Sequence, residues 1–165
     1  MSLCQWLVLL VAAQRLAEVG YARRNEWRLM AAGGSEAGAG HYPLFFLLHG
    51  AWLAALWVAV PAGTAISWPL LALFAALQGA RLWVIASLGR WWTTRIITVP
   101  EAPLVRRGPY RWLKHPNYLV VAGEIAVLPL AFGEWGIALV FSALNALLLA
   151  HRIRIEDAAL APRRG

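Results

Sequence analysis

Charged residues are scarce in this sequence. Asp, Glu, Lys and Arg make up only 14% of its 165 residues, whereas about a quarter of the residues of a soluble domain are charged. With 61% hydrophobic residues and ten tryptophans, the chain has too little polar surface for a soluble protein and many side chains that favour a membrane interface. Its composition and length therefore predict one integral membrane domain over residues 1–165.

Cysteine and acidic residues are also scarce. Cys4 is the one cysteine, which excludes an internal disulfide and a cysteine-based metal site, and we expect no metal. Eight acidic residues against fifteen Lys and Arg give a net charge of +7, but no nucleic-acid motif accompanies this charge. We therefore expect no nucleic-acid partner, and interpret the basic residues as flanks of membrane spans that meet lipid head groups.

Five apolar stretches approach the length of about 20 residues that a transmembrane helix needs. The first stretch has neither the basic start nor the cleavage site of a signal peptide, so we interpret it as retained. Very short connections at residues 61–63 and 133–134 predict two antiparallel hairpins after the N-terminal span. The sequence thus predicts an all-α membrane protein with spans at about residues 3–21, 43–60, 64–88, 116–132 and 135–150.

Basic residues are distributed unevenly between the connections. Thirteen of the fifteen lie in segments 22–42 and 89–115 and in the tail from residue 151, which includes Arg163 and Arg164, and the short turns have none. With five spans, all three basic segments fall on one side, which the positive-inside rule makes the cytoplasm. We expect an outside N-terminus and a cytoplasmic C-terminus, in a bacterial inner membrane.

Four polar residues lie inside predicted spans at a similar depth: Arg15, Arg81, Glu124 and Asn145. At 1.5 Å per residue, each is about 9–12 Å from the cytoplasmic end of its span. Such residues are costly in hydrocarbon and usually face the interior of a bundle. Two interpretations are open: ion pairs that hold helices together, or the floor of a pocket. Both predict that Arg81 lies close to Glu124.

The most informative motif covers residues 108–118 and reads GPYRWLKHPNY. Pro116 suits the first turn of a helix, which places His115 at a helix N-terminus that favours a bound anion. Asn117 and Glu124 are seven residues apart and share a helix face. The alternative is an interfacial anchor of aromatic and basic side chains that binds no ligand.

A second motif, HRIRIED, covers residues 151–157 at the end of the fifth span. Arg152 and Glu156 are four residues apart and lie on one helix face, as they also would in an ordinary helical ion pair. Because the last two spans are antiparallel, both motifs emerge at the same membrane surface. Together their side chains can bind a zwitterion that carries an aromatic base.

The two motifs resemble those of the isoprenylcysteine carboxyl methyltransferase family, in which GPYRxxRHPxY is followed, after a helical hairpin, by RxxxEE. Lys114 and Asp157 depart from this pattern but keep its charges, although lysine lacks the bidentate geometry of arginine. The similarity extends over essentially the whole chain, to a bacterial branch associated with O-methylation of alkylresorcinol- or alkylpyrone-type lipids, and includes Asn25, residues 41–43, His49 and residues 88–96.

This resemblance implies S-adenosylmethionine as the cofactor, bound at the cytoplasmic ends of the last two spans. Arg152 suits its carboxylate and Glu156 its ammonium group. The full set of implied cofactor-binding residues is Lys114, His115, Pro116, Asn117, Tyr118, Arg152 and Glu156.

The resemblance also implies a lipophilic acceptor that enters from the bilayer, with a prenylcysteine-type carboxylate or a phenolic or pyrone hydroxyl. A phenol or enol would profit from a base or a nearby cation. Candidates for this acceptor end are His41, Arg81, Arg95 and Glu124, although His41 also suits an interfacial helix cap.

Three other functions stay open. A phospholipid N-methyltransferase would methylate amines, and a reductase of the sterol-reductase kind would bind a nicotinamide cofactor and usually has more spans. A non-catalytic membrane protein that docks lipids or partners would not bind S-adenosylmethionine.

Overall fold

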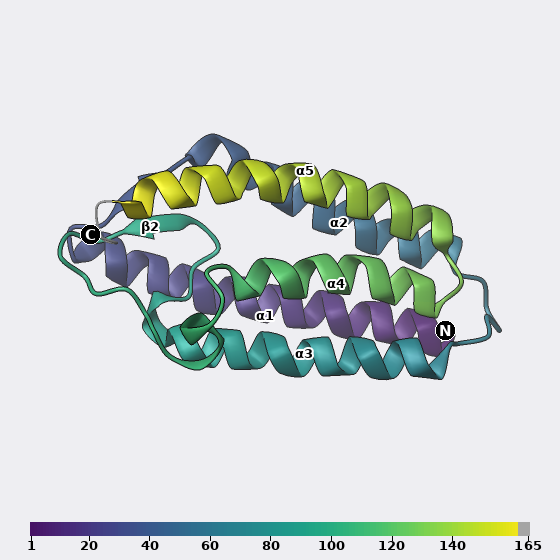
Figure 1. Cartoon of the computed structure of the whole chain (residues 1–165). Coiled ribbons are helices and arrows are strands. Elements are labelled where there is room, and N and C mark those ends of the chain that lie inside the picture. The colour runs from purple at the N-terminus through teal and green to yellow at the C-terminus, as the bar shows by residue number, and fades with distance from the viewer. Residues whose placement is uncertain (162–165) are drawn as a thin grey trace.

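Five helices make up most of the residues that the structure, a computed structural model, describes. These are residues 1–161, so Arg163 and Arg164 of the predicted basic tail lie outside them. The helices alternate in direction along a common axis (Figure 1), which confirms the predicted all-α membrane protein. They are α1 (Leu3–Ala31), α2 (Tyr42–Ala59), α3 (Trp68–Leu88), α4 (Pro116–Ala131) and α5 (Trp135–Leu160).

Four of these helices are long and apolar enough to cross a membrane, and α4 is a shorter apolar helix. The first and last helices extend beyond the predicted spans, α1 past residue 21 to Ala31 and α5 past residue 150 to Leu160. Hydropathy locates only the apolar part of a helix, whereas arginine and glutamate continue a helix almost as well as leucine. The polar end of α1 was therefore not predicted, whereas the shared helix face of Arg152 and Glu156 already required the fifth helix to continue past residue 150.

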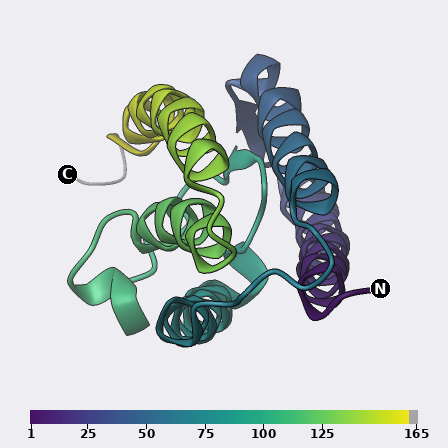
Figure 2. The ribbon, with the colours of Figure 1, turned by 90° about the vertical axis from the view of Figure 1, so that its right-hand side faces the viewer.

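The predicted tight turn between the second and third spans is wrong. The connection covers residues 60–67, and α3 begins at Trp68. The backbone amide of Ser67 donates a hydrogen bond to the carbonyl of Ala131 (2.9 Å), which ties the start of α3 to the end of α4. Consequently α3 packs mainly on α4, and α2 packs on α5 and α1, as the end-on view of Figure 2 shows. The last two helices do form the predicted antiparallel pair.

The two long connections and the end of α5 lie together at one end of the bundle (Figure 1), as expected for the basic segments. There β1 (Ser35–Ala37) pairs with β2 (Ile96–Thr98) in an antiparallel arrangement that the sequence did not predict. Asn25 of α1 donates hydrogen bonds from its side-chain amide to the carbonyls of Gly89 and Trp92. These contacts hold the long connections against the ends of the helices.

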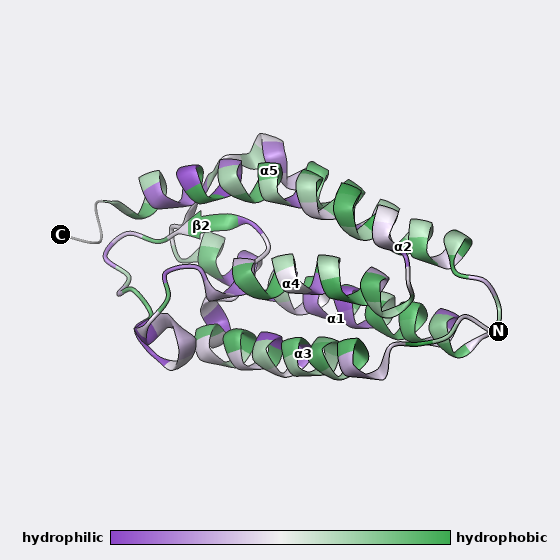
Figure 3. Cartoon of the chain, turned by 45° about the vertical axis from the view of Figure 1, so that its right-hand side comes forward, coloured by the Kyte–Doolittle hydropathy of each residue, from purple (hydrophilic) through white to green (hydrophobic). Residues whose placement is uncertain are grey.

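An apolar core joins the helices, with Trp52, Leu56, Ile125 and Leu128 almost fully buried. Large apolar residues are also exposed along the outside of the bundle, as is expected where lipid replaces water. Figure 3 shows hydrophobic residues along the helices and many hydrophilic residues at the end where β2 lies. The polar chemistry of the chain is therefore gathered at that end and in one buried layer.

Candidate functional site

The buried layer is a network of ion pairs centred on Arg81. Its guanidinium lies 2.6 Å from the carboxylate of Glu18 and 3.2 Å from that of Glu124. Arg15 contacts the same two carboxylates, at 3.0 Å and 2.8 Å, and Gln78 donates a hydrogen bond to Glu124. The predicted proximity of Arg81 and Glu124 is thus confirmed.

The composition of this layer differs from the prediction in two ways. Glu18 belongs to it, although the sequence alone marked this residue only as an interruption of the first span. Asn145 is buried as expected, but its Oδ1 has no hydrogen-bond partner among residues 1–161, and it does not join the network. The burial of Asn145 was therefore predicted correctly, but burial alone did not make it a member of the ion-pair network.

The first motif folds against the end of α3. Gly108 begins a 3-10 turn, η3 (Gly108–Arg111), with a positive φ of 56°. A Cβ atom at this position would lie 2.0 Å from the Oγ of Ser87, so only glycine allows the loop to pack this closely. Pro116 then begins α4, as predicted. The motif thus brings His115 and Tyr118 to the polar end of the bundle.

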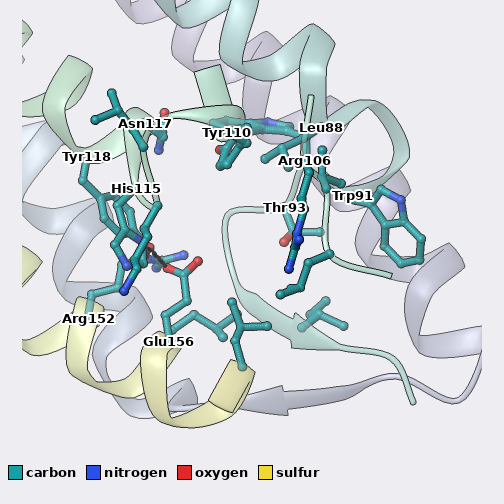
Figure 4. A pocket seen from close by; sticks show the side chains of 18 of the residues that line it. Leu88, Trp91, Thr93, Arg106, Tyr110, His115, Asn117, Tyr118, Arg152 and Glu156 are labelled. Carbon is teal, nitrogen blue, oxygen red and sulfur yellow. Dashed lines mark hydrogen bonds and ion pairs between the residues drawn. The ribbon is translucent and has the colours of Figure 1, made fainter. Parts of the chain in front are cut away.

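The two motifs meet at the adjacent ends of α4 and α5 (Figure 4). The rings of His115 and Tyr118 are stacked, with centroids 5.3 Å apart. The hydroxyl of Tyr118 donates a short hydrogen bond to Glu156 and accepts one from Nε of Arg152 (2.8 Å). His115 Nε2 also lies 3.1 Å from a carboxylate oxygen of Asp157. The side chains that the two motifs contribute therefore form one cluster.

This cluster forms one wall of a cavity of about 460 Å³, which we call the outer pocket (Figure 4). Its other walls come from Leu88, from residues 91–93, 95–97 and 103–106, and from Tyr110. Burial, followed by the nearby charge of Glu156, raises the pKa of Tyr110, so that its hydroxyl stays neutral. Six of the seven implied cofactor-binding residues line this pocket: Lys114, His115, Asn117, Tyr118, Arg152 and Glu156. The seventh, Pro116, is buried and is not among the lining residues.

A second cavity of about 320 Å³, the inner pocket, lies between the helices. Apolar side chains such as Leu16, Phe45 and Leu53 line most of it. Arg15, Glu18, Arg81 and His49 supply its polar part. The structure therefore shows the buried layer to be both a set of ion pairs and a part of a pocket wall.

The two pockets adjoin at a shared set of side chains, which we call the junction. Arg152 is held there by a hydrogen bond from its guanidinium to the carbonyl of Thr94 (2.8 Å) and lies over the ring of Phe45. The Oδ1 of Asn117 is buried and has no hydrogen-bond partner within residues 1–161. The residues common to both pockets are Trp92, Thr93, Asn117, Tyr118 and Arg152.

The four candidates for the acceptor end do not form one group. Arg81 lines the inner pocket, and Glu124 pairs with it. Arg95 instead lines the outer pocket, where its guanidinium pairs with Glu36 at 2.8 Å. His41 precedes α2 and packs against the ring of His151, and it is not among the lining residues of either pocket. The structure does not bring these four residues together, because their positions depend on how the connections fold over the bundle.

Sequence reasoning missed several residues that the structure places at the pockets. His49 was noted only for its part in the family resemblance. It is, however, a polar residue inside an apolar span, and such residues usually face the bundle interior and mark functional sites, so this criterion alone could have selected it. Its Nδ1 lies 2.9 Å from the carbonyl of Phe45. Trp92 and Thr93 lie in a connection without regular periodicity, and no pattern in the sequence indicates their position.

The fold and the pockets define a helical integral membrane protein in which the more polar pocket, at one end of the bundle, adjoins a largely apolar pocket between helices. The chain belongs to the isoprenylcysteine carboxyl methyltransferase (ICMT) family, whose sequence profile matches residues 70–162. It is 40% identical over 160 residues to the uncharacterized protein YpbQ of Bacillus subtilis (strain 168), covering 94% of this chain and 95% of that protein. No solved structure matches it. Family membership suggests a membrane methyltransferase.

Proposed function

We propose that the protein is an S-adenosylmethionine-dependent O-methyltransferase that acts on a lipophilic acceptor. The observation that carries this proposal is that the two pockets adjoin and share Asn117, Tyr118 and Arg152 as wall residues. A methyl transfer between a polar donor and a lipid requires two sites of opposite character in direct contact. The acceptor would carry either a prenylcysteine-type carboxylate or a phenolic or pyrone hydroxyl.

The residues of the outer pocket fit the cofactor. Arg152 forms no ion pair with any described residue, and Glu156 pairs with no lysine or arginine among them. These two opposite charges on one helix face would hold the carboxylate and the ammonium group of an amino acid. The cavity of about 460 Å³ is within the usual range for small-molecule sites. When bound, the cofactor supplies a sulfonium-linked methyl group for transfer to the acceptor oxygen.

The protein's main contribution to the reaction would be alignment, which can supply much of the rate of a displacement. Tyr118 is fixed from two sides by Arg152 and Glu156, and Arg152 is fixed in turn by the carbonyl of Thr94. The junction is therefore held in place by a chain of hydrogen bonds that continues from α4 to α5 and to the 89–115 connection. These hydrogen bonds would keep the boundary between the two pockets at a constant position.

The inner pocket would hold the acceptor, which enters from the bilayer between helices. A carboxylate acceptor is already ionised near neutral pH and needs no base, whereas a hydroxyl acceptor needs a partner for its proton. His49 can serve as that partner. Its Nδ1 donates to the carbonyl of Phe45, which leaves the lone pair on Nε2, and no described residue hydrogen-bonds this atom.

The same proposal sets the orientation of the protein in the membrane. Basic residues gather at the end of the bundle that carries the outer pocket, and the two connections at the opposite end have none. We place the outer pocket and the C-terminus in the cytoplasm and the N-terminus outside, in a bacterial inner membrane.

The test is to incubate the purified protein in lipid nanodiscs with S-adenosylmethionine that carries a radiolabelled methyl group. The lipid panel contains prenylcysteines, alkylresorcinols and phosphatidylethanolamine. We expect label on an acceptor oxygen and direct binding of the cofactor in calorimetry. Label on phosphatidylethanolamine alone would instead identify a phospholipid N-methyltransferase, and absence of cofactor binding would refute the methyltransferase proposal.

A further inference from the structure

A third pocket, of about 460 Å³, shares a wall with the outer pocket. Three of the residues that line it are arginines, Arg90, Arg106 and Arg107, and none is acidic. Trp91 and residues 103–105 complete its lining. Nothing in the proposed methyl transfer uses this concentration of positive charge.

Within the described residues, these three arginines lack the carboxylate partners that other arginines have. Arg107 donates a hydrogen bond from Nε to the carbonyl of Ser87 (2.6 Å). The Cζ of Arg90 lies 4.8 Å from the centroid of the Trp91 ring, over which the guanidinium is placed. Among residues 1–161, no ion pair involves Arg90, Arg106 or Arg107. By contrast, Arg15, Arg81 and Arg95 each contact two carboxylates.

Like charges in one pocket repel one another. The fold nevertheless holds two of the guanidiniums in place, one by a hydrogen bond and the other by an aromatic ring. An anion with several oxygens would relieve the repulsion and accept hydrogen bonds from the guanidinium N–H groups. Phosphate suits this role because guanidinium binds it with two parallel hydrogen bonds.

The surroundings of the pocket indicate that such a phosphate belongs to a lipid. Pro103, Leu104 and Val105 give the pocket an apolar side. A Cβ atom built at Gly108, the residue after Arg107, would lie 3.2 Å from Nε1 of Trp83, whose ring packs on that of Trp112. Trp83 is 50% exposed and Trp112 is 70% exposed, and exposed tryptophans favour the head-group level of a bilayer.

We propose that this third pocket binds the head-group phosphate of an anionic phospholipid from the leaflet at the polar end of the bundle. Basic pockets at the ends of transmembrane helices bind anionic head groups in this way. The inference is independent of methyl transfer, because it uses none of the residues of the junction. Pro103, Leu104, Val105, Arg106 and Trp91 also line the outer pocket, so a bound head group would steady a wall of that pocket.

The proposal is tested by native mass spectrometry of the full chain in detergent, titrated with dioctanoyl-phosphatidylglycerol or with dioctanoyl-phosphatidylcholine. We expect the anionic lipid to bind at least about tenfold more tightly, which corresponds to about 1.4 kcal/mol. The double variant Arg90→Gln/Arg106→Gln should lose this preference. The matched control, Arg23→Gln/Arg24→Gln, removes two exposed charges near the same end of the bundle and should change the affinity by less than about twofold.

Three results would overturn the proposal. The first is equal weakening by both double variants, which would mean that general charge attraction explains the binding. The second is displacement of the lipid by inorganic phosphate at similar concentration, which would make this a site for a free anion. The third needs no variant: a phosphatidylglycerol with a photoreactive head group should crosslink the wild-type chain within residues 90–91 or 103–107, and crosslinks only elsewhere would contradict the assignment.

Discussion

The buried layer and the junction both contain arginine beside glutamate, but they pair these residues differently. In the layer, Arg81 contacts the carboxylates of Glu18 and Glu124 directly. At the junction, Tyr118 stands between Arg152 and Glu156, and no described residue forms an ion pair with Arg152. The comparison shows that pairing, and not residue type, separates an arginine that stabilises a bundle from one that is available to a ligand.

The largest effect is expected from Glu124→Ala, which would leave the guanidiniums of Arg15 and Arg81 with only Glu18 as a carboxylate partner. Removing one member of a buried ion pair costs about 3–5 kcal/mol. We therefore expect a strongly lowered unfolding temperature in detergent. If Glu124→Ala unfolded at the wild-type temperature, the layer would have no structural role and the contrast with the junction would fail.

Glu156→Gln should affect binding and leave stability nearly unchanged. Losing a hydrogen bond to a charged group costs about 1.5–3 kcal/mol, so we expect S-adenosylmethionine to bind about 10- to 100-fold more weakly in calorimetry. Arg154→Gln, an exposed change on the same helix, is the control and should bind the cofactor normally. Unchanged affinity in Glu156→Gln would remove Glu156 from the site.

His49→Phe should separate the two classes of acceptor. Turnover of a hydroxyl acceptor is expected to fall about tenfold or more, because the variant lacks the free Nε2 that would take the proton. Turnover of a carboxylate acceptor and binding of S-adenosylmethionine should be unaffected. An equal loss for both acceptors would show that the substitution only disturbs packing around Phe45.

The smallest effect is expected from Glu36→Ala, which breaks the ion pair with Arg95 at the polar end. The side chain of Arg95 is 42% exposed, and exposed ion pairs contribute about 0–1 kcal/mol. Thermal unfolding should hardly change, which makes this variant the matched comparison for Glu124→Ala. A loss as large as that of Glu124→Ala would mean that the pairing of β1 with β2 depends on this contact.

Much of the architecture could be predicted from local patterns. Five apolar stretches predicted the five helices, and the distribution of basic residues predicted which connections share one end. The proximity of Arg81 and Glu124 followed from equal depth and from the cost of leaving either charge unpaired in hydrocarbon. The meeting of His115 with Arg152 followed from the short turn between the last two helices.

Other features depended on contacts that no local pattern contains. The third helix packs mainly on α4, although a hairpin with α2 was predicted. This packing reflects the longer connection at residues 60–67 and its hydrogen bond to Ala131. His41 was predicted at the acceptor end, but it packs against His151. The positions of Trp92 and Thr93 at the junction depend on how a long connection folds back over the helix ends.

The amino-acid sequence by itself determined the number of helices, the end of the bundle that is polar and the two motifs that meet there. These properties depend on hydropathy and helical spacing, which act over a few turns. Only the tertiary structure decided that the outer and inner pockets adjoin and share wall residues, and which arginines have no carboxylate partner among residues 1–161. Those properties arise where segments far apart in the chain come into contact, and the free energy of each pairing depends on all the neighbours that share it.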